Sequence, residues 1–441
     1  MFTSFLLVDG ACFYNISKMA KPVPSRTYYA QVRKHEPWKD DVPEKKLMSE
    51  QEIYQKLDRH TFSECIKENE KKCSPPKSNQ EARKIQEDVE KIANGVVSNL
   101  SRKFKLFEGS SLLKTGSTYE GVKIGNPDEF DYMIEVPALS KDIIEIRDNP
   151  MEGYVWHARV KDVNFFHDIY PSAHSESISQ FSVNFFMALK KIVMDYIQDN
   201  LPPNWSMAPK VAPDRSKYFA FSASGVPGDG GYSRMKELSW AMQQKVAITP
   251  HLIWSGNIYR NMEVSLDFCL AIPTLFDKRD SYVYFPSEPP AHAAANMLSC
   301  HVLLLTRFCL RMSFSKEEQR IMKQYPYPDG QNRCMRLLKF LRDERLTEID
   351  PETGAPLTGL PTYWIKTILY GMYQEYSHAS QWQSDYLGVR VVQALDRLID
   401  ACARIDLPSF FLPNCNLLRP ESGCRQVAEK VKGNILYEFI R

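Results

Sequence analysis

The sequence has no apolar run that approaches the ~20 residues of a membrane-spanning helix, so we expect no contact with a membrane. It also has no excess of either charge, because 56 lysine and arginine residues face 54 aspartate and glutamate residues in 441. This balance excludes a global basic field and limits any nucleic-acid contact to local patches. The ten cysteines include no CxxC pair, which argues against a paired-cysteine metal site and against a disulfide framework.

Several cysteines sit in apolar segments, among them Cys269, Cys309 and Cys402, where they are expected to be small buried hydrophobes. The N-terminal apolar run is short and has no preceding basic residue, so it does not resemble a signal peptide. These features favour a reducing, cytoplasmic environment. Cys300 and His301 are adjacent, but no second pair lies at ligand spacing, and we predict no zinc site.

A phosphate-binding loop of the Walker type is also missing. The Gly/Ser-rich segment 222–233 contains no Gly-Lys-Ser/Thr sequence, and we interpret it as a surface loop. Gly116-Ser117 is another candidate, because it precedes a short helix expected over 118–122. Glycine permits close approach to a phosphate, and N–H groups at a helix start can bind it. This dipeptide is too common to assign a site by itself.

The most informative segment that is present is an alternating strand over 130–136. Successive side chains of a strand point to opposite faces, so its even positions face a core while Glu129 and Asp131 point together to the other side. Two carboxylates this close repel each other unless a cation neutralises them, and Mg²⁺ is the natural candidate. The alternative is an edge strand with a solvated acidic face.

A second strand carries one more carboxylate. The sequence predicts a hairpin with strands at 246–254 and 258–272, and Asp267 lies on the non-core face of the second strand. An unpaired charge on an apolar strand needs a partner. If this strand lies beside the first, Glu129, Asp131 and Asp267 converge into a two-metal site suited to phosphoryl transfer.

The chain divides into three parts. Residues 1–77 are rich in Lys, Glu and Pro and are expected to form a separate arm of unknown role, with a short helix near 49–59. Residues 78–290 mix helices and strands, whereas residues 291–441 show mainly helical periodicity. We therefore predict an α+β protein with a mixed-sheet lobe followed by a helical lobe. The helices of the second part are expected over 291–309, 315–323, 331–344, 361–375, 386–405 and 422–440.

A long helix is predicted to open the second part. Ser78 and Glu81 fit a capping box, and an apolar stripe then runs from Ile85 to Leu100. Its opposite face and C-terminal end are basic. The cations are Arg83, Lys84, Lys91, Arg102 and Lys103. They are either a solvated face that suits the helix dipole or a ridge that binds phosphates. A further helix is expected over 178–200.

Taken together, these motifs resemble the family of cyclic GMP-AMP synthase and the cGAS-like receptors, within the template-independent nucleotidyltransferases. The resemblance extends from about residue 80 to the C-terminus and leaves the N-terminal arm uncovered. The motifs that carry it are Thr115–Ile124, Asn126–Asp131, Val264–Asp267, Arg311–Glu318, Cys334–Leu341 and Thr362–Thr367.

The resemblance implies a two-lobed nucleotidyltransferase fold with a long spine helix, and a role for each matched residue. Glu129, Asp131 and Asp267 match the catalytic carboxylates that bind Mg²⁺ or Mn²⁺. The matched nucleotide-binding residues are Thr115, Gly116, Ser117, Arg311, Ser313, Ser315, Lys339, Thr362 and Tyr363. Among these, Tyr363 matches an aromatic that stacks on a base, and Lys339 a lysine that contacts phosphate.

The resemblance further implies an enzyme of innate immunity that makes a cyclic dinucleotide, such as cyclic GMP-AMP, from ATP and GTP. The helix that follows Ser78 matches the spine helix, whose bending on ligand binding orders the loop with residues 121–127. The basic face of this helix then favours nucleic-acid contact over a merely solvated face.

One departure from the vertebrate type concerns the activator. A His/Cys zinc thumb is expected just before residue 331, but the segment 323–330 contains neither histidine nor paired cysteines. Members without the thumb resemble receptors for double-stranded RNA, which is bound through its shape and backbone. RNA is therefore the expected activator and DNA the less favoured one. The rival hypotheses are a non-catalytic scaffold with the same fold and a cyclase activated by another ligand. The sequence leaves the oligomeric state open.

Overall fold

The computed structural model describes most of the chain from residue 47 onward, and residues 47–441 belong to one unit. The described residues are 47–72, 80–150, 155–170, 178–209, 247–277, 282–284, 297–304, 309–324, 328–349, 356–358, 360–413, 415–418 and 424–440. Two predicted features lie outside these ranges, namely the loop 222–233 and Ser78, the N-cap expected for the long helix.

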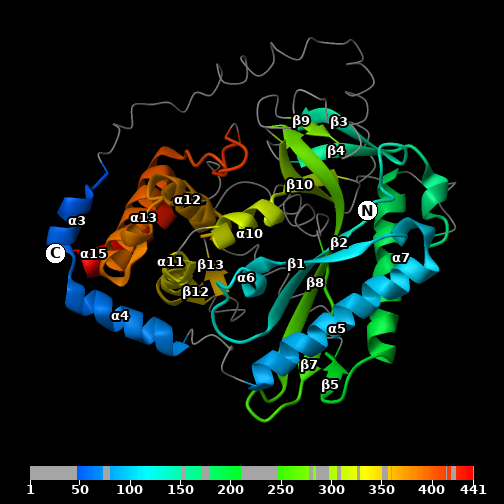
Figure 1. Ribbon diagram of the computed structural model, residues 1–441, viewed down its shortest axis with the longest axis horizontal. Coiled ribbons are helices and arrows are strands. Elements are labelled where there is room, and N and C mark those ends of the chain that lie inside the picture. The colour runs from blue at the N-terminus through cyan, green and yellow to red at the C-terminus, as the bar shows by residue number, and fades with distance from the viewer. Residues whose placement is uncertain are drawn as a thin grey trace, which may run out of the picture. The chain divides into compact units, whose positions relative to one another are not determined.

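A mixed β-sheet carries the two acidic strands side by side (Figure 1). Its main path runs β1-β2-β8-β10-β11-β4-β3, and only the β2–β8 pair in this path is parallel. The bounds in this order are Ser111–Thr115, Glu129–Glu135, Met262–Asp277, Met297–Leu304, Cys309–Ser313, Val155–Val160 and Ile144–Pro150. Four short strands extend the sheet: β5 (Trp205–Met207), β6 (Ala247–Ile248), β7 (His251–Trp254) and β9 (Tyr282–Tyr284).

The core face of the sheet follows the predicted alternation. Phe130, Tyr132 and Leu266 are at most 1% exposed, whereas the alternate residues of β2 and β8 point to the other face. The helices α5 (Gln80–Lys103) and α7 (Ile178–Asp199) pack against each other and share this core. The apolar stripe of α5 is buried along its whole length, as predicted.

The start of α5 is tied to the β7–β8 hairpin. The Glu81 carboxylate accepts hydrogen bonds from Trp254 Nε1 at 2.8 Å and from the backbone N–H groups of Asn257, Ile258 and Tyr259 at 2.9–3.2 Å. Burial alone would raise the pKa of Glu81, but these hydrogen bonds lower it. The hairpin is confirmed, and its turn is longer than predicted, because β8 begins only at Met262.

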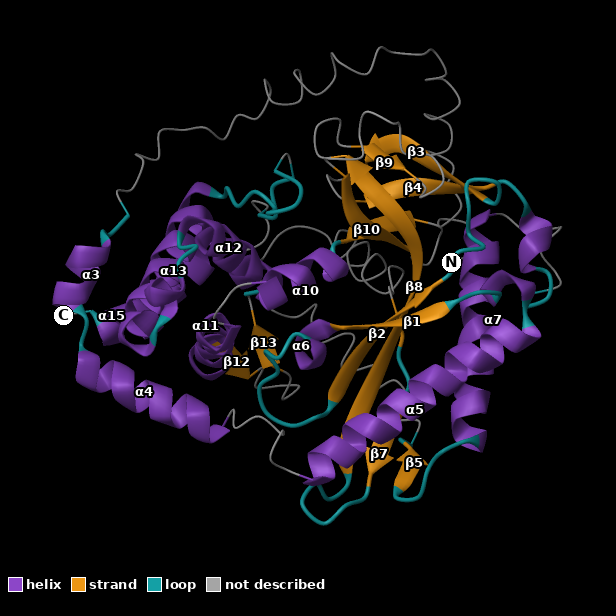
Figure 2. Ribbon diagram, in the orientation of Figure 1, coloured by secondary structure: helices purple, strands orange, loops and turns teal. Residues whose placement is uncertain are grey.

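Helices follow the sheet, which confirms the predicted α+β class with a helical C-terminal region. They are α10 (Ser315–Gln324), α11 (Pro328–Leu341), α12 (Thr362–Glu375), α13 (Ser384–Arg404), α14 (Cys424–Val431) and α15 (Tyr437–Phe439). Figure 2 shows these helices grouped on one side of the sheet. Two π-helical turns, η6 (Arg342–Leu346) and η9 (Lys432–Leu436), follow α11 and α14, so the last predicted helix is broken into three pieces.

The helix predicted over 291–309 is wrong, because residues 297–304 form strand β10 and Cys309 begins strand β11. β10 lies between β8 and β11. Val302 and Leu304 point to one face of the sheet and Leu303 points to the other, and all three residues are buried. A strand covered on both faces reads as a continuous apolar run without alternation. The sheet therefore extends beyond residue 290, where we expected the helical lobe to begin.

Part of the expected arm packs onto the C-terminal helices. Helix α3 (Glu50–Lys56) begins where the sequence predicts a short helix and has Ser49 as its N-cap, and α4 (Arg59–Lys72) follows. Phe62 packs edge-on against Phe439 with ring centroids 5.4 Å apart. The fully buried Arg390 donates from Nη1 to a carboxylate oxygen of Glu50 at 2.8 Å. Residues 47–72 therefore belong to the same unit as the sheet and the helices.

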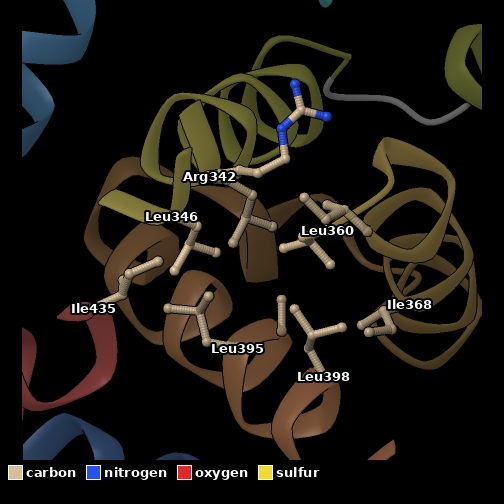
Figure 3. A pocket seen from close by; sticks show the side chains of 10 residues that line it. Arg342, Leu346, Leu360, Ile368, Leu395, Leu398 and Ile435 are labelled. Carbon is tan, nitrogen blue, oxygen red and sulfur yellow. The ribbon is translucent and has the colours of Figure 1, made fainter. Parts of the chain in front are cut away.

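None of the described helices combines the length and the apolar character needed to cross a bilayer. A gap of about 10 Å³ lies between α11, α12, α13 and η9, and Figure 3 shows apolar side chains around it, with the Arg342 guanidinium pointing away. This volume is roughly that of one water molecule, so it is a packing gap and not a ligand site. Its lining residues are Leu338, Arg342, Leu346, Leu360, Ile365, Ile368, Ala394, Leu395, Leu398 and Ile435.

Candidate active site

Three carboxylates converge on the face of the sheet opposite the core. Because β2 and β8 are parallel and in register, Asp131 lies directly beside Asp267, and Glu129 is two residues away on the same face. Carboxylate oxygens of all three residues lie within 4.8 Å of one another. Oxygen ligands at this spacing suit a hard divalent cation such as Mg²⁺ or Mn²⁺. The structure therefore contains the pairing of the two acidic strands on which the predicted convergence of the carboxylates depended.

The electrostatics of this cluster also fit a cation. Burial, followed by the charges of Glu129 and Asp267, raises the pKa of Asp131 to about 7. Lys123 Nζ lies 3.3 Å from Glu129, but it also lies 2.7 Å from Asp128 and so is shared between two carboxylates. Among the described residues the three carboxylates therefore remain under-compensated, and a bound divalent cation would offset their repulsion.

Gly116 is fixed by its contact with Asp131. Strand β1 pairs with β2 so that Thr115 lies opposite Asp131, and the chain then turns at Gly116 with a φ of +76° into the one-turn helix α6 (Gly116–Tyr119). A Cβ atom on Gly116 would stand 1.8 Å from Asp131 Oδ2. Glycine is therefore required both by the backbone conformation and by the carboxylate. The helix begins two residues earlier than predicted.

A cavity of about 660 Å³ lies next to this cluster, within the size range of small-molecule sites, and of the three carboxylates only Asp131 lines it. The sheet and α6 contribute one wall, and the helical region contributes the facing wall. Among the predicted site residues, those that line it are Thr115, Gly116, Asp131, Arg311, Ser313, Ser315 and Tyr363. Segments almost 250 residues apart in the sequence thus meet at one cavity.

Three other predicted nucleotide contacts do not line this cavity. They are Ser117, Lys339 and Thr362. Lys339 Nζ donates instead to the carbonyl oxygen of Val122 at 3.0 Å, and burial together with nearby cations lowers its pKa to about 8. The Thr362 hydroxyl accepts a hydrogen bond from Arg342. A contact of these side chains with nucleotide therefore stays a prediction.

Comparison with known proteins agrees with this geometry. A family model described as "Mab-21 protein HhH/H2TH-like domain" matches residues 330–432. Over 355 residues, the chain is 21% identical to cyclic GMP-AMP synthase of Mus musculus, and the match covers 80% of this chain and 65% of the relative. Cyclic GMP-AMP synthase of Sus scrofa is 21% identical over 378 residues, which cover 80% of this chain and 67% of the relative.

The chain is thus distantly similar to cyclic GMP-AMP synthases, and residues 330–432 are similar to a Mab-21 domain. It spans just under two thirds of the length of the mouse relative. The residues that the Mab-21 domain model matches include Tyr363 and Lys366 on α12, which face the cavity. The similarity thus reaches both walls of the cavity, although the identity is low.

Several cavity residues were not singled out from the sequence. Lys366 lies 2.8 Å from Glu120 and 2.9 Å from Glu318, both of which are buried. Burial alone would lower the pKa of Lys366, but the two carboxylates raise it above its ordinary value. The segment after α13 adds Ser409, which hydrogen-bonds Tyr363. These residues occur in ordinary helix and loop patterns, so only the tertiary structure brings them to the cavity.

The expected nucleic-acid-binding residues lie on the solvent side of α5. Arg83, Lys84, Lys91, Arg102 and Lys103 are all exposed. Of these, Lys84, Lys91 and Arg102 share one face, because their spacings of 7 and 11 residues are close to whole turns. Lys84 is already paired with Asp88 at 2.6 Å. The geometry permits the predicted contact with a phosphate backbone but does not require it.

The same helix contacts residues on either side of the turn that contains Gly116. Glu90 of α5 accepts a hydrogen bond from Lys114 Nζ at 2.6 Å and another from the Tyr119 hydroxyl. Lys114 and Tyr119 flank the turn that contains Gly116. A displacement of α5 would therefore act directly on the residues beside Asp131.

Proposed function

We propose that this protein is a ligand-activated, metal-dependent nucleotidyltransferase that joins ATP and GTP into a cyclic dinucleotide, cyclic GMP-AMP being the favoured product. The observation that carries the proposal is the convergence of Glu129, Asp131 and Asp267, of which Asp131 lines a cavity that residues of the helical region also line. Under-compensated carboxylates beside a cavity of this size suit metal-assisted phosphoryl transfer.

The three carboxylates would hold Mg²⁺ or Mn²⁺, and the metal would supply charge neutralisation for the phosphates and activation of the attacking hydroxyl. Gly116, without a side chain, leaves room for the Asp131 carboxylate, and the backbone N–H groups at the start of α6 would bind a phosphate. Ser313 and Ser315, whose hydroxyl oxygens lie 2.9 Å apart, would donate hydrogen bonds to the substrate together with Arg311. Tyr363 would stack on a base.

The favoured activator is double-stranded RNA bound along the exposed cations of α5, with the signal passing through Glu90 to Lys114 and Tyr119. Duplex binding by a few lysines and arginines depends on backbone contacts and on salt, and not on base sequence. Only three residues separate the end of α10 at Gln324 from the start of α11 at Pro328. No zinc-binding insertion fits there, which supports RNA over DNA. We place this activity in the cytoplasm, as part of an innate immune response.

The test is a synthesis assay on the purified full chain with ATP, GTP and Mg²⁺ or Mn²⁺, in the presence of duplex RNA, duplex DNA or neither. The expected product is phosphatase-resistant and has the mass of a cyclic dinucleotide, and it forms with RNA. The variant Asp267→Ala is the control and should form none. Product formation with DNA and not with RNA would identify DNA as the activator. Nucleotide binding without turnover under every condition would favour a non-catalytic scaffold.

A further inference from the structure

A second polar cluster lies on the same face of the sheet as the three carboxylates. Its centre is Glu135, the last residue of β2, four positions after Asp131. One carboxylate oxygen lies 2.7 Å from His301 Nε2 and 2.5 Å from Lys316 Nζ, and the other accepts a hydrogen bond from Ser111 Oγ at 2.6 Å. The three partners come from β10, α10 and β1, so one side chain joins four elements.

The burial and charges within this cluster are unequal. The His301 side chain is fully buried, whereas those of Glu135 and Lys316 are 15% and 38% exposed. His301 Nδ1 has no hydrogen-bond partner among the described residues. The hydrogen bond from His301, with those from Lys316 and Ser111, holds the pKa of Glu135 well below its ordinary value. A neutral imidazole that donates from Nε2 to an ionised carboxylate fits all of these contacts.

The cluster is linked to Ser313 and Ser315, the two serines that line the cavity, through β10 and α10. His301 on β10 is the cross-strand neighbour of Ser313 on β11. Lys316 follows Ser315 directly and lies in the first turn of α10. Between the cluster and the three carboxylates lies an apolar patch that includes Met133, Ala271 and Leu303. The Glu135 carboxylate is therefore a polar connection from the strand of the metal carboxylates to the elements that carry the two serines.

We propose that Glu135 is a positioning residue that fixes Ser313 and Ser315 at the distance from Asp131 that a bound nucleotide requires. The residue itself does not line the cavity and acts through His301 and Lys316. This role rests on the proposed function, since it presumes that the serines contact substrate. Charge-assisted hydrogen bonds are strong enough to fix such a geometry, and a loss of supporting contacts typically weakens a site by about 10–100-fold.

The experiment compares nucleotide binding, metal dependence and melting temperature in the full-length wild type and four variants. Glu135→Gln removes the charge and keeps the shape, and Glu108→Gln is the matched control at an exposed turn. His301→Leu removes the donor, and His301→Gln restores a donor near the Nε2 position. The probe is a non-hydrolysable ATP analogue at saturating Mg²⁺, followed by a titration of Mg²⁺.

We expect Glu135→Gln and His301→Leu to weaken analogue binding by about tenfold, with the Mg²⁺ midpoint changed by less than about twofold. His301→Gln should restore most of the binding, and Glu108→Gln should match the wild type. Wild-type binding by folded Glu135→Gln protein would overturn the positioning role alone. Loss that tracks melting temperature and is not restored by His301→Gln would show a merely structural role. If the wild type binds no nucleotide, the proposed function fails and the positioning role fails with it.

Discussion

The two ends of strand β2 carry the same kind of side chain in opposite circumstances. At one end, Asp131 shares its surroundings with two further carboxylates, and its pKa rises to about 7. At the other end, Glu135 has a lysine, a histidine and a serine within 2.7 Å, and its pKa falls below the ordinary value. Both ends lie on the face of the sheet opposite the core. At the Asp131 end, the negative charge of three carboxylates exceeds what Lys123 offsets, so a bound cation would be favourable. At the Glu135 end, both carboxylate oxygens already have partners within the protein.

This difference separates a candidate site from a structural contact more sharply than residue type does. Alternation placed Glu129, Asp131 and Glu135 on one face of a strand, and nothing in that pattern distinguishes them. What distinguishes Asp131 from Glu135 is their surroundings, since burial and like charges raise the pKa of Asp131, whereas hydrogen-bond donors lower that of Glu135. A carboxylate with a raised pKa beside a cavity is a candidate for binding metal or substrate, whereas a carboxylate whose partners all lie within the protein is a candidate for positioning other residues.

The largest effect should come from neutralising the acidic end. We expect Asp267→Asn to lower cyclic dinucleotide synthesis by at least about 100-fold, because metal coordination supplies several kcal/mol of transition-state stabilisation. Asp128→Asn is the matched control, since Asp128 is adjacent in sequence to Glu129 and shares Lys123 with it but is not itself one of the three clustered carboxylates. It should keep activity within about threefold. Steady-state rates at saturating nucleotide check both, and equal losses in the two variants would contradict a specific metal role.

A smaller effect should follow from crowding the same end without changing its charge. In Gly116→Ala, the new Cβ would stand 1.8 Å from Asp131 Oδ2, so the carboxylate must move. We expect an activity loss of about 10–100-fold, in the range seen when a supporting contact of a metal ligand is lost. Gly109→Ala is the control, because its φ of +71° is nearly the same and nothing lies within 4 Å of the added atom.

The two variants share the strain of an alanine at positive φ, about 1–3 kcal/mol, so both should melt at a lower temperature. Only Gly116→Ala should also raise the Mg²⁺ concentration needed for half-maximal activity. An equal Mg²⁺ requirement in both would mean that the position of Asp131 does not depend on the absent side chain.

Metal binding at the Asp131 end of β2 should depend on pH. Asp131, with a pKa of about 7, is protonated at pH 6 and must lose its proton when a divalent cation binds. Mn²⁺ affinity should therefore rise by about tenfold per pH unit up to about pH 7 and then level off. Calorimetry in buffers of different ionisation enthalpy should detect the release of about one proton at pH 6 and almost none at pH 8. A flat profile between pH 5.5 and 7 would contradict the raised pKa.

Individual helices and strands could be predicted from the sequence better than the contacts between them. The alternation of residues 130–136, the stripe of α5 and most of the later helices were predictable, because one-sided burial leaves a periodic pattern. Strand β10 was not, since burial on both faces removes that pattern. The adjacency of Asp131 and Asp267 could be stated only as a condition, because periodicity carries no information on which strands pair. Lys366 and Ser409 were missed for the same reason.

The smallest effect, on folding stability, contrasts the two ends most directly. Without divalent cations at pH 8, Asp131→Asn should stabilise the protein by about 1–4 kcal/mol, because it removes a carboxylate whose pKa burial and two like-charged neighbours raise to about 7. Glu135→Gln should destabilise it by about 1 kcal/mol, because the donors lose a charged acceptor. At pH 5 the Asp131→Asn gain should be smaller, because native Asp131 is then already protonated, and it should vanish only below the unfolded value of about 3.9, where the unfolded chain also binds the proton.

The Glu135→Gln loss should persist at pH 5, because a carboxylate of lowered pKa contributes stability above the unfolded value of about 4.3 and loses it only under more acidic conditions. Denaturant unfolding at the two pH values measures all four differences. Shifts of the same sign for the two variants at pH 8 would mean that Asp131 is as well compensated as Glu135. The absence of cation-demanding charge at the candidate site would then remove the main reason for assigning a metal to it.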